Sequence, residues 1–336
     1  MKDVAALAGV SLGTVSNVVN SPQLVSEATR TKVEVAITKL GWVPNESARQ
    51  LRAGRSRSIG MVVMDISNPF FADVLAGAET AVYQHGYTLQ IGNSRSEPSR
   101  EGEQLLLFEQ QRVRGILYTP VEAMNDRVAQ LRYRNIPVVI VDRAGDGSGY
   151  CSVSVDDVEG GRLAAEHLIA QGHRAIAVVG GPASLQQVRD RRLGVDIARA
   201  QQGDPVQVVT ITTEAMDAAA GVAAAEQIVA LPALDRPTGV FATNDLLAIG
   251  LLQGFVTQGL RIPQDVAIIG YDDISFAASA AVPLSSIRQP REALGRRAAE
   301  LLFDEIAAAD DNSGHEHRSV RFTPELVVRR SSKLSL

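Results

Sequence analysis

Residues 58–84, SIGMVVMDISNPFFADVLAGAETAVYQ, show the pattern from which the fold of most of this chain is predicted. It joins a short apolar run, typical of a buried strand, to a helical segment that follows an Asn-Pro turn. The same alternation recurs along the chain, and continuous apolar strands between helices predict parallel sheets covered on both faces. The predicted strands are Ile59–Met64, Thr88–Ile91, Gly115–Tyr118, Val138–Val141, Ala175–Val179, Val206–Ile211, Gly239–Thr243 and Val266–Gly270. The predicted helices between them include Phe71–Gln84, Arg100–Arg112, Val158–Gln171, Ala215–Val229 and Asp245–Gln258.

Two breaks in this alternation favour two sheets over one. The first is the Gly- and Ser-rich segment 142–155, which holds an isolated short strand, Cys151–Val155. The second is 275–286, after which come a helix and a short pair of strands, Glu292–Ala308, Ser319–Phe322 and Glu325–Arg329. We therefore predict an α/β core of two similar, doubly wound parallel-sheet lobes. The first lobe would comprise 59–155 and 284–317, and the second 156–283 and 318–336.

Composition supports this size of core. The 336 residues are 45% hydrophobic and 21% charged, which predicts two or three folded domains and excludes general disorder. No apolar run approaches the length of a membrane helix, so no membrane partner is expected, and residues 1–10 lack the apolar segment of a secretion signal. Cys151 is the only cysteine, so an intrachain disulfide is impossible and a cytoplasmic location is expected.

Residues 1–58 differ from the rest in charge and in pattern. They hold eight of the chain's 33 Lys and Arg and four of its 38 Asp and Glu, a net +4, whereas the remainder carries −9. A basic head on an acidic body indicates a polyanion partner, with chance fluctuation as the alternative. Its predicted helices are Lys2–Ala8, Ser11–Asn20, Glu27–Leu40 and Glu46–Leu51, followed by the basic linker Arg55–Ser58.

The first two helices fit a helix-turn-helix. Gly9 stands at the tight turn, where a positive φ is needed, and Ser11 is a natural N-cap for the second helix. The shared apolar patch is predicted to hold Val4, Val10, Val15 and Val18. Short side chains on the exposed face of the second helix would let it enter a major groove, where Asn17 could read an adenine edge. The candidate DNA-binding residues are Leu12, Gly13, Thr14, Ser16, Asn17 and Asn20. A plain helical hairpin is the alternative.

In the body, polar and aromatic side chains follow the predicted strands, at the edge where parallel sheets bind ligands. These residues are Phe70, Phe71, Asp142, Arg143, Asn244, Asp245, Asp272 and Asp273, to which we add Arg191 from an Arg-x-x-Gly stretch and Gln289 from a chain crossing. Carboxylates, Arg and Asn can bind vicinal hydroxyls, and an aromatic face can cover the C–H surface of a sugar. As structural alternatives, Asp245 and Asp273 would cap helices or turns, Arg143 would form a surface ion pair and Phe71 would be core.

The sequence does not predict an enzyme. It has no phosphate-binding Gly-x-x-x-x-Gly-Lys loop, no dinucleotide fingerprint and no Gly-x-Ser-x-Gly elbow, so no cofactor is expected. In the segment 309–317, His315-Glu316-His317 could bind a metal, but no cysteine or further histidine lies nearby in sequence. We therefore predict a solvated loop there and no metal site.

Long stretches of the chain resemble the LacI/GalR family of bacterial transcriptional regulators. The resemblance covers essentially the whole chain. The stretches are DVAALAGVSLGTVSNVVNSPQLVSEATRTKVEVAITKLGWVPNESARQLR (3–52), SIGMVVMDISNPFF (58–71), PVVIVDR (137–143), ATNDLLAIG (242–250), VAIIGYDDI (266–274) and SIRQP (286–290).

The resemblance implies an N-terminal all-α helix-turn-helix head, a hinge helix at 45–52 and a two-lobed core like that of periplasmic binding proteins. It implies that Leu51 wedges between base pairs in the minor groove, with Arg52 beside it at phosphate or the groove floor. Ordinary packing of Leu51 against the core is the alternative. The effector-contacting positions that it implies are Phe70, Phe71, Asp142, Arg143, Arg191, Asn244, Asp272 and Gln289.

Two departures from the family pattern stand out. Asn17 occupies a position where many members carry Arg, which predicts a different operator half-site. Residues that usually precede Lys2-Asp3 are missing, which indicates either a misplaced start at Met1 or a poorly capped first helix.

We therefore expect a homodimeric repressor that binds a palindromic operator and responds to a small effector in the cleft between the lobes, most simply a carbohydrate. No leucine heptad follows the last strand, so a tetramer is not expected. The alternative is a sugar-binding protein of periplasmic type without a DNA role. The basic head and the lack of a secretion signal count against it.

Overall fold

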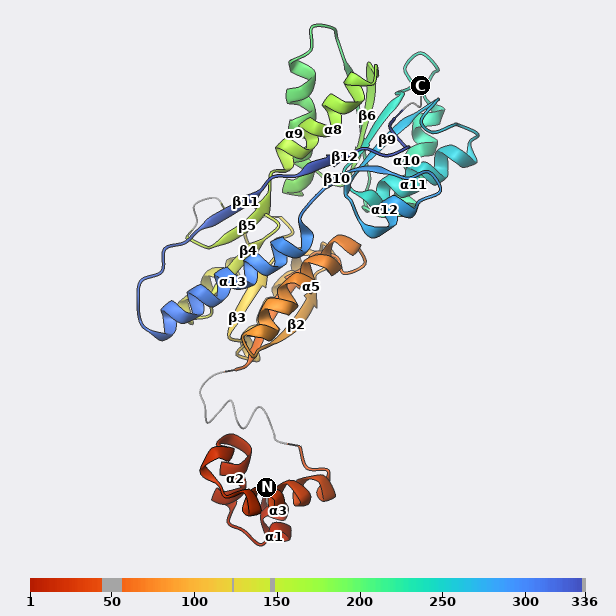
Figure 1. Ribbon diagram of the computed structural model, residues 1–336. Coiled ribbons are helices and arrows are strands. Elements are labelled where there is room, and N and C mark those ends of the chain that lie inside the picture. Colours follow the sequence, from red (N-terminus) through yellow and green to blue (C-terminus); the bar gives the residue numbers. More distant parts are fainter. Residues whose placement is uncertain (44–55, 123, 146–148, 334–336) are drawn as a thin grey trace. The chain divides into compact units, whose positions relative to one another are not determined.

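The computed structural model describes residues 1–43, 56–122, 124–145 and 149–333 (Figure 1). Its contacts divide the chain into two units, Met1–Ser56 and Arg57–Leu336, and we describe each by itself. No described helix is both long enough and apolar enough to cross a membrane.

The N-terminal unit is a small helical bundle. Its helices are α1 (Lys2–Ala8), α2 (Leu12–Asn20), the short 3-10 helix η1 (Pro22–Leu24) and α3 (Glu27–Leu40). Gly9 ends α1 in the left-handed region at φ 67°, and the side chain of Ser11 accepts a hydrogen bond from the Thr14 N–H to cap α2. These are the turn and the cap that the sequence predicts. The core of the bundle contains Val4, Ala5, Val15, Val18, Val33 and Ala36, with Val10 packed against it.

The second unit contains two six-stranded sheets, one in each lobe. The first sheet has the spatial order β11 (Ser319–Phe322), β5 (Ser152–Val155), β4 (Val138–Val141), β3 (Gly115–Tyr118), β1 (Ser58–Val63), β2 (Thr88–Asn93). The second has the order β12 (Glu325–Val327), β10 (Ser285–Arg288), β9 (Ala267–Asp272), β8 (Gly239–Ala242), β6 (Ala175–Gly180), β7 (Gln207–Thr212). All pairs are parallel except β10 with β12.

Helices cover both faces of each sheet, as Figure 1 lets the reader follow. On the first sheet, one face carries α5 (Pro69–Gln84) and α13 (Arg291–Asp310), and the other carries α6 (Pro98–Gln110) and α7 (Asp126–Tyr133). On the second sheet, α8 (Asp157–Ala170) and α9 (Gln186–Ala200) face α10 (Ala218–Ala230) and α11 (Asp245–Thr257) across the strands, with the short α12 (Ser275–Ser279) beside α11. The parallel, two-lobed α/β architecture is therefore confirmed.

The strand pairing corrects the expected lobe boundaries at two places. We expected 284–317 in the first lobe and 318–336 in the second. Strand β10 belongs instead to the second sheet, and β11 belongs to the first. The chain therefore passes between the lobes three times, after β5, after β10 and after β11. Strand β10 was missed because its sequence, SSIR, has a single large apolar residue.

Three helix pairs pack through facing glycines, and one of these contacts positions a residue of the cleft. A Cβ on Gly161 of α8 would lie 1.9 Å from the backbone oxygen of Arg191 on α9, and a Cβ on Gly194 would lie 2.0 Å from the oxygen of Val158. Only glycine permits this approach of two backbones, so the α8–α9 contact sets where the Arg191 side chain begins.

We expect Gly161→Ala to lower the free energy of unfolding by about 2–3 kcal/mol, because α9 must move to accept the methyl group. Gly102→Ala on α6 is the matched control, since its Cβ would meet only the Asn125 amide at 3.5 Å. The control should be neutral or gain up to about 1 kcal/mol from helix propensity. Urea unfolding of both variants measures the difference, and equal midpoints would contradict the close-packing argument.

Candidate functional site

A cavity of about 350 Å³ lies between the two lobes, at the carboxyl ends of the strands. Its size is within the range of small-molecule sites. Both lobes line it, with Met64, Asp65, Asn68, Phe70, Phe71, Arg95, Ser96, Val121, Glu122 and Asp142 from the first and Pro182, Ser184, Leu185, Gln187, Val188, Arg191, Glu214, Ala215, Met216, Asn244 and Asp272 from the second.

Arg191 is the buried cation of this cavity, with 5% of its surface exposed. Its Nε donates to Asp157 Oδ1 at 2.7 Å, and its Nη1 donates to the backbone oxygen of Thr243. The guanidinium carbon lies 3.6 Å from the centroid of the Tyr271 ring. The guanidinium is therefore held by a carboxylate, a carbonyl and an aromatic face, and its position is defined before any ligand arrives.

Asp142 faces Arg191 from the other lobe. It follows β4 in the left-handed region at φ 59°. The side chain of Gln187, one turn before Arg191 on α9, donates to both Asp142 Oδ2 (3.1 Å) and its backbone oxygen (3.0 Å). Burial, and then the nearby Asp157, raise the pKa of Asp142 to about 8, although Arg191 and Gln187 act in the opposite direction. Its carboxyl group is therefore largely protonated at neutral pH in the ligand-free protein.

Asp272 ends β9 and lines the cavity together with Arg191 and Asp142. Gln289 donates to its Oδ1 at 2.7 Å, and Arg291 donates to its backbone oxygen. Burial raises the pKa of Asp272 to about 6, and Arg191 and the Gln289 hydrogen bond limit the rise. Gln289 does not itself line the cavity; it positions Asp272, and its own Oε1 is buried without a partner among the described residues.

Asn244 lines the cavity and also caps α11. Its Oδ1 accepts from the Leu247 N–H at 2.9 Å, and its Nδ2 donates to the Met216 oxygen at 2.8 Å. The neighbouring Asp245 and Asp273 do not line the cavity and contact the protein instead. Asp245 accepts from the Ser286 hydroxyl and the Ile274 N–H, while Asp273 pairs with Arg288 and Arg329.

The remaining candidates behave differently from one another. Phe70 and Phe71 line the cavity as an edge-to-face pair with ring centroids 5.0 Å apart, and both also belong to the core of the first lobe. Arg143 does not line the cavity, because its Nη1 contacts the backbone oxygen of Glu122. Six of the eight candidate effector residues thus face one cavity.

Sequence reasoning missed several lining residues. Arg95, Glu122 and Glu214 follow β2, β3 and β7. Ligands bind parallel sheets at the carboxyl ends of the strands, so the position of these three residues after strands was a signal that could have identified them. Gln187 could have been found from its i, i+4 spacing to Arg191, but the polar stretch 186–200 was not predicted to be a helix.

The candidate DNA-reading surface lies on α2. Leu12, Gly13, Asn17 and Asn20 are exposed, and Thr14 and Ser16 are half-buried. Two pairs are tied within the helix, since Thr14 Oγ1 contacts Ser11 Oγ at 2.9 Å and Asn20 Nδ2 donates to the Ser16 oxygen. Within the described head, the Asn17 side chain makes no hydrogen bond and is available to an outside partner. Leu51, Arg52 and the rest of the predicted hinge helix, 45–52, lie outside the described residues.

Comparisons with known proteins match both units. The family model for bacterial regulatory proteins of the lacI family matches residues 1–45, and a periplasmic binding protein-like domain matches residues 165–332. The HTH-type transcriptional repressor PurR of Photobacterium profundum is 35% identical over 334 residues, which cover 99% of this chain and 98% of the relative.

Solved structures agree with the sequence match. The lac repressor dimer bound to operator and the anti-inducer ONPF has a TM-score of 0.79 at 27% identity and covers 98% of each chain. A complex of the transcriptional regulator CelR with cellobiose has a TM-score of 0.70 at 31% identity, also covering 98% of each chain.

Proposed function

The chain belongs to the lacI family of bacterial regulatory proteins, and from this premise we propose that it is a dimeric repressor controlled by a neutral carbohydrate. Like its relatives in this family, it is a DNA-binding transcriptional regulator with a cleft for an effector. The observation that carries the proposal is the inter-lobe cavity, where Asp142 from the first lobe meets Arg191 and Asp272 from the second. A ligand that binds these groups together would change the position of one lobe relative to the other.

The charge of the cavity selects the effector class. Its described lining has five carboxyl groups, from Asp65, Glu122, Asp142, Glu214 and Asp272, against the guanidinium groups of Arg95 and Arg191. Even with Asp142 protonated, an anionic effector such as a sugar phosphate would meet more carboxylates than guanidinium groups. Sugar hydroxyls can instead donate to Asp142 and Asp272, accept from Arg191 and place an apolar C–H face against Phe70. The relative with cellobiose in its structure supports this class.

We infer that the cavity binds its ligand without changing it chemically. The carboxyl groups of Asp142 and Asp272 are held by Gln187 and Gln289, and the guanidinium of Arg191 is held by Asp157. This arrangement positions donors and acceptors, and no nucleophile with an adjacent base lines the described cavity. The proposed place of action is the cytoplasm, where a bacterial operator lies.

A thermal-shift screen of the full chain tests the effector class. The probes are neutral mono- and disaccharides, sugar phosphates, nucleosides and purines. A ligand at 100 times its Kd stabilises the folded state by about 2.7 kcal/mol, which raises the Tm by a few degrees. We expect shifts from neutral sugars only. A shift confined to sugar phosphates or purines would refute the carbohydrate assignment, and no shift at all would refute the cleft as a sensor of these classes.

On the DNA side, we propose that two α2 helices read the half-sites of a palindromic operator. By resemblance, Leu51 of each chain would enter the central minor groove and Arg52 would lie beside it. Selection from a random duplex library with the full chain would yield the operator. Selected sequences without two-fold symmetry would contradict binding as a dimer. An affinity for DNA that does not fall as the salt concentration rises would contradict contacts between the basic head and the phosphates.

Asn17→Ala is expected to weaken binding to the selected operator by about 1–3 kcal/mol, because a bidentate contact to one base would be lost. Binding to a scrambled duplex should not change, since Asn17 carries no charge. Thr31→Ala on the exposed surface of α3 is the control and should leave both affinities unchanged. Fluorescence anisotropy with labelled duplexes measures all three proteins. Equal losses on both duplexes would show that Asn17 does not read a base.

A further inference from the structure

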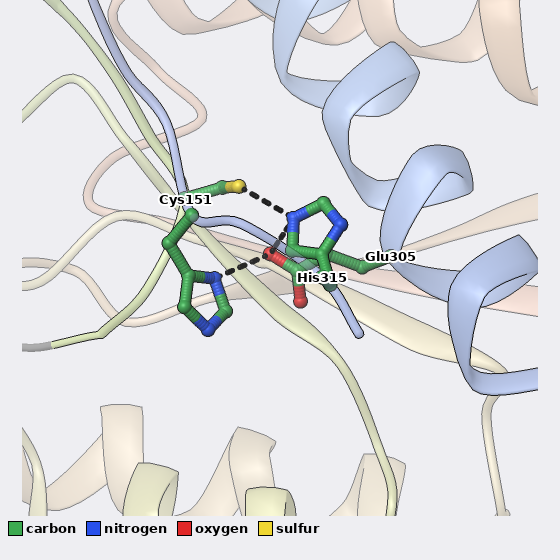
Figure 2. Close-up of side chains that lie close together, drawn as sticks. Cys151, Glu305 and His315 are labelled. Atoms are coloured by element: carbon green, nitrogen blue, oxygen red, sulfur yellow. Dashed lines mark hydrogen bonds and ion pairs between the residues drawn. The ribbon is translucent and has the colours of Figure 1, made fainter. Parts of the chain in front are cut away.

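The first lobe brings together four potential metal ligands from two distant stretches of the chain, Cys151 from one and Glu305, His315 and His317 from the other. Cys151 precedes β5, Glu305 lies on the last turns of α13, and His315 and His317 lie between α13 and β11. Strands β5 and β11 pair with Ser152 opposite Ser319, which places Cys151 beside the end of the histidine segment. Figure 2 shows the Cys151 sulfur and the Glu305 carboxylate facing the ring of His315. One ligand atom from each of the four residues lies within 4.8 Å of all the others.

Three of the six separations between the ligand atoms are close to the edges of one coordination tetrahedron. Metal–ligand bonds of about 2.0–2.3 Å, as zinc makes to nitrogen, oxygen and sulfur, give edges of about 3.3–3.8 Å. Cys151 Sγ lies 3.2 Å from His315 Nε2, and Glu305 Oε1 lies 3.8 Å from His315 Nε2 and 3.5 Å from His317 Nδ1. The set of sulfur, two imidazole nitrogens and one carboxylate oxygen is also the donor set that zinc prefers.

Burial and unsatisfied polar atoms point independently to a ligand. Cys151 is fully buried and Glu305 is 8% exposed. Glu305 Oε1 and His317 Nδ1 are both buried without a hydrogen-bond partner among the described residues, although they face each other. Such atoms cost about 1–3 kcal/mol each unless something satisfies them. A cation between them would do so, and the backbone N–H of Arg318, 3.3 Å from Cys151 Sγ, would support a thiolate ligand.

We propose that Cys151, Glu305, His315 and His317 form a tetrahedral site for Zn²⁺ or a similar borderline-soft divalent ion. A thiolate, a carboxylate and two neutral imidazoles balance the charge of the ion, as a buried site requires. Binding releases the thiol proton of Cys151 to solvent. With four protein ligands and no open position, the site is structural and not catalytic. The half-buried histidines form its solvent side.

The metal would join the end of α13 and the segment after it to strand β5, which lies far from them in the sequence. It would tie the end of α13 to the 311–318 segment and to the β5–β11 pair. Strand β11 leads directly into the last crossing to the second lobe, so the ion would anchor one end of that crossing. We expected a solvated loop because no further metal ligand lies near His315 in sequence. Cys151 lies near it only in the folded chain. The inference rests on this lobe alone and is independent of the proposed effector.

Cobalt titration of the full chain, without a histidine tag and after treatment with a chelator, tests the site. We expect the visible bands of tetrahedral Co²⁺ together with a near-ultraviolet sulfur-to-cobalt charge-transfer band, both saturating at one equivalent per chain. Zinc should abolish the colour by displacing cobalt, and it should raise the unfolding midpoint of the metal-free protein. A weak octahedral spectrum without the charge-transfer band would overturn the proposal.

Variants assign the ligands. Cys151→Ser should lose the charge-transfer band, and Glu305→Gln and His317→Ala should each weaken zinc binding by more than about 100-fold. His173→Ala, which removes a histidine of the second lobe, is the matched control and should bind as the parent does. Unchanged zinc affinity in Cys151→Ser would overturn the site. If that variant does not fold, the cobalt spectrum of the parent chain decides the question by itself.

Discussion

Arg191→Ala is expected to abolish the effector response and to lower the free energy of unfolding by about 3–5 kcal/mol. The guanidinium is the buried partner of Asp157, so its removal leaves that carboxylate without a counter-ion in a site that water hardly reaches. The same change removes the only cation that Asp142 and Asp272 share in the described cavity. Effector affinity should therefore fall by at least about 100-fold, which corresponds to 2.7 kcal/mol.

Urea unfolding and calorimetric titration with the effector found in the screen measure the two losses. Arg199→Ala is the matched control, because Arg199 lies on the same helix but is exposed, and its one ion pair among the described residues is with Asp196. It should change stability by less than about 0.5 kcal/mol and leave effector affinity intact. Unchanged effector affinity in Arg191→Ala would remove Arg191 from the site, and unchanged stability would contradict the buried ion pair.

Asp142→Asn is expected to stabilise the ligand-free protein, and more strongly as the pH rises. Because folding raises the pKa of Asp142 to about 8, the folded state favours the protonated carboxyl. Its contribution to stability is fully present below the unfolded pKa of about 4 and is lost as the pH rises through about 8. Asparagine resembles the protonated acid and removes that loss. The gain at pH 8.5 should be on the order of 2–5 kcal/mol, falling towards zero at pH 4.

The measurement is the free energy of unfolding of parent and variant from pH 4 to pH 9 without effector. Asp196→Asn, which removes an exposed carboxylate of α9, should show no such divergence. Parallel pH curves for Asp142→Asn and the parent would show that the carboxyl is ionised in the folded protein. At pH 9, where the Asp142 carboxyl of the parent is ionised, the variant should also bind a neutral sugar more weakly, because sugar hydroxyls donate to a carboxylate.

The residues that line the cleft could be predicted from the sequence, but the contacts of their side chains could not. Apolar runs marked the strands, and polar residues directly after them marked the edge where Asp142, Asn244 and Asp272 meet. The sequence offered both Arg143, directly after a predicted strand, and Arg191, in an Arg-x-x-Gly stretch, as candidates for the cleft. The structure separates them, because Arg143 contacts Glu122 at the rim whereas α9 directs Arg191 inward.

The misplaced lobe boundaries have a similar cause. Ser285 and Ser286 look like loop residues, yet β10 is buried because Ser331 bonds to the Ser285 N–H and Ser286 bonds to Asp245. Those partners lie some forty residues away, and hydrophobic periodicity carries no information about them. The first lobe, in turn, gains β11 from near the C-terminus through pairing with β5.

Local signals along the chain were sufficient to predict the helix-turn-helix, most of the strands and the family. Gly9, the Ser11 cap and the valine spacing act within one or two helical turns, and a run of apolar residues indicates a strand wherever it lies. The raised pKa of Asp142, the contacts that hold Arg191 and the contact of Cys151 with His315 could be found only from the folded structure. These features arise from desolvation and from contacts between distant segments, and both exist only after the chain has folded.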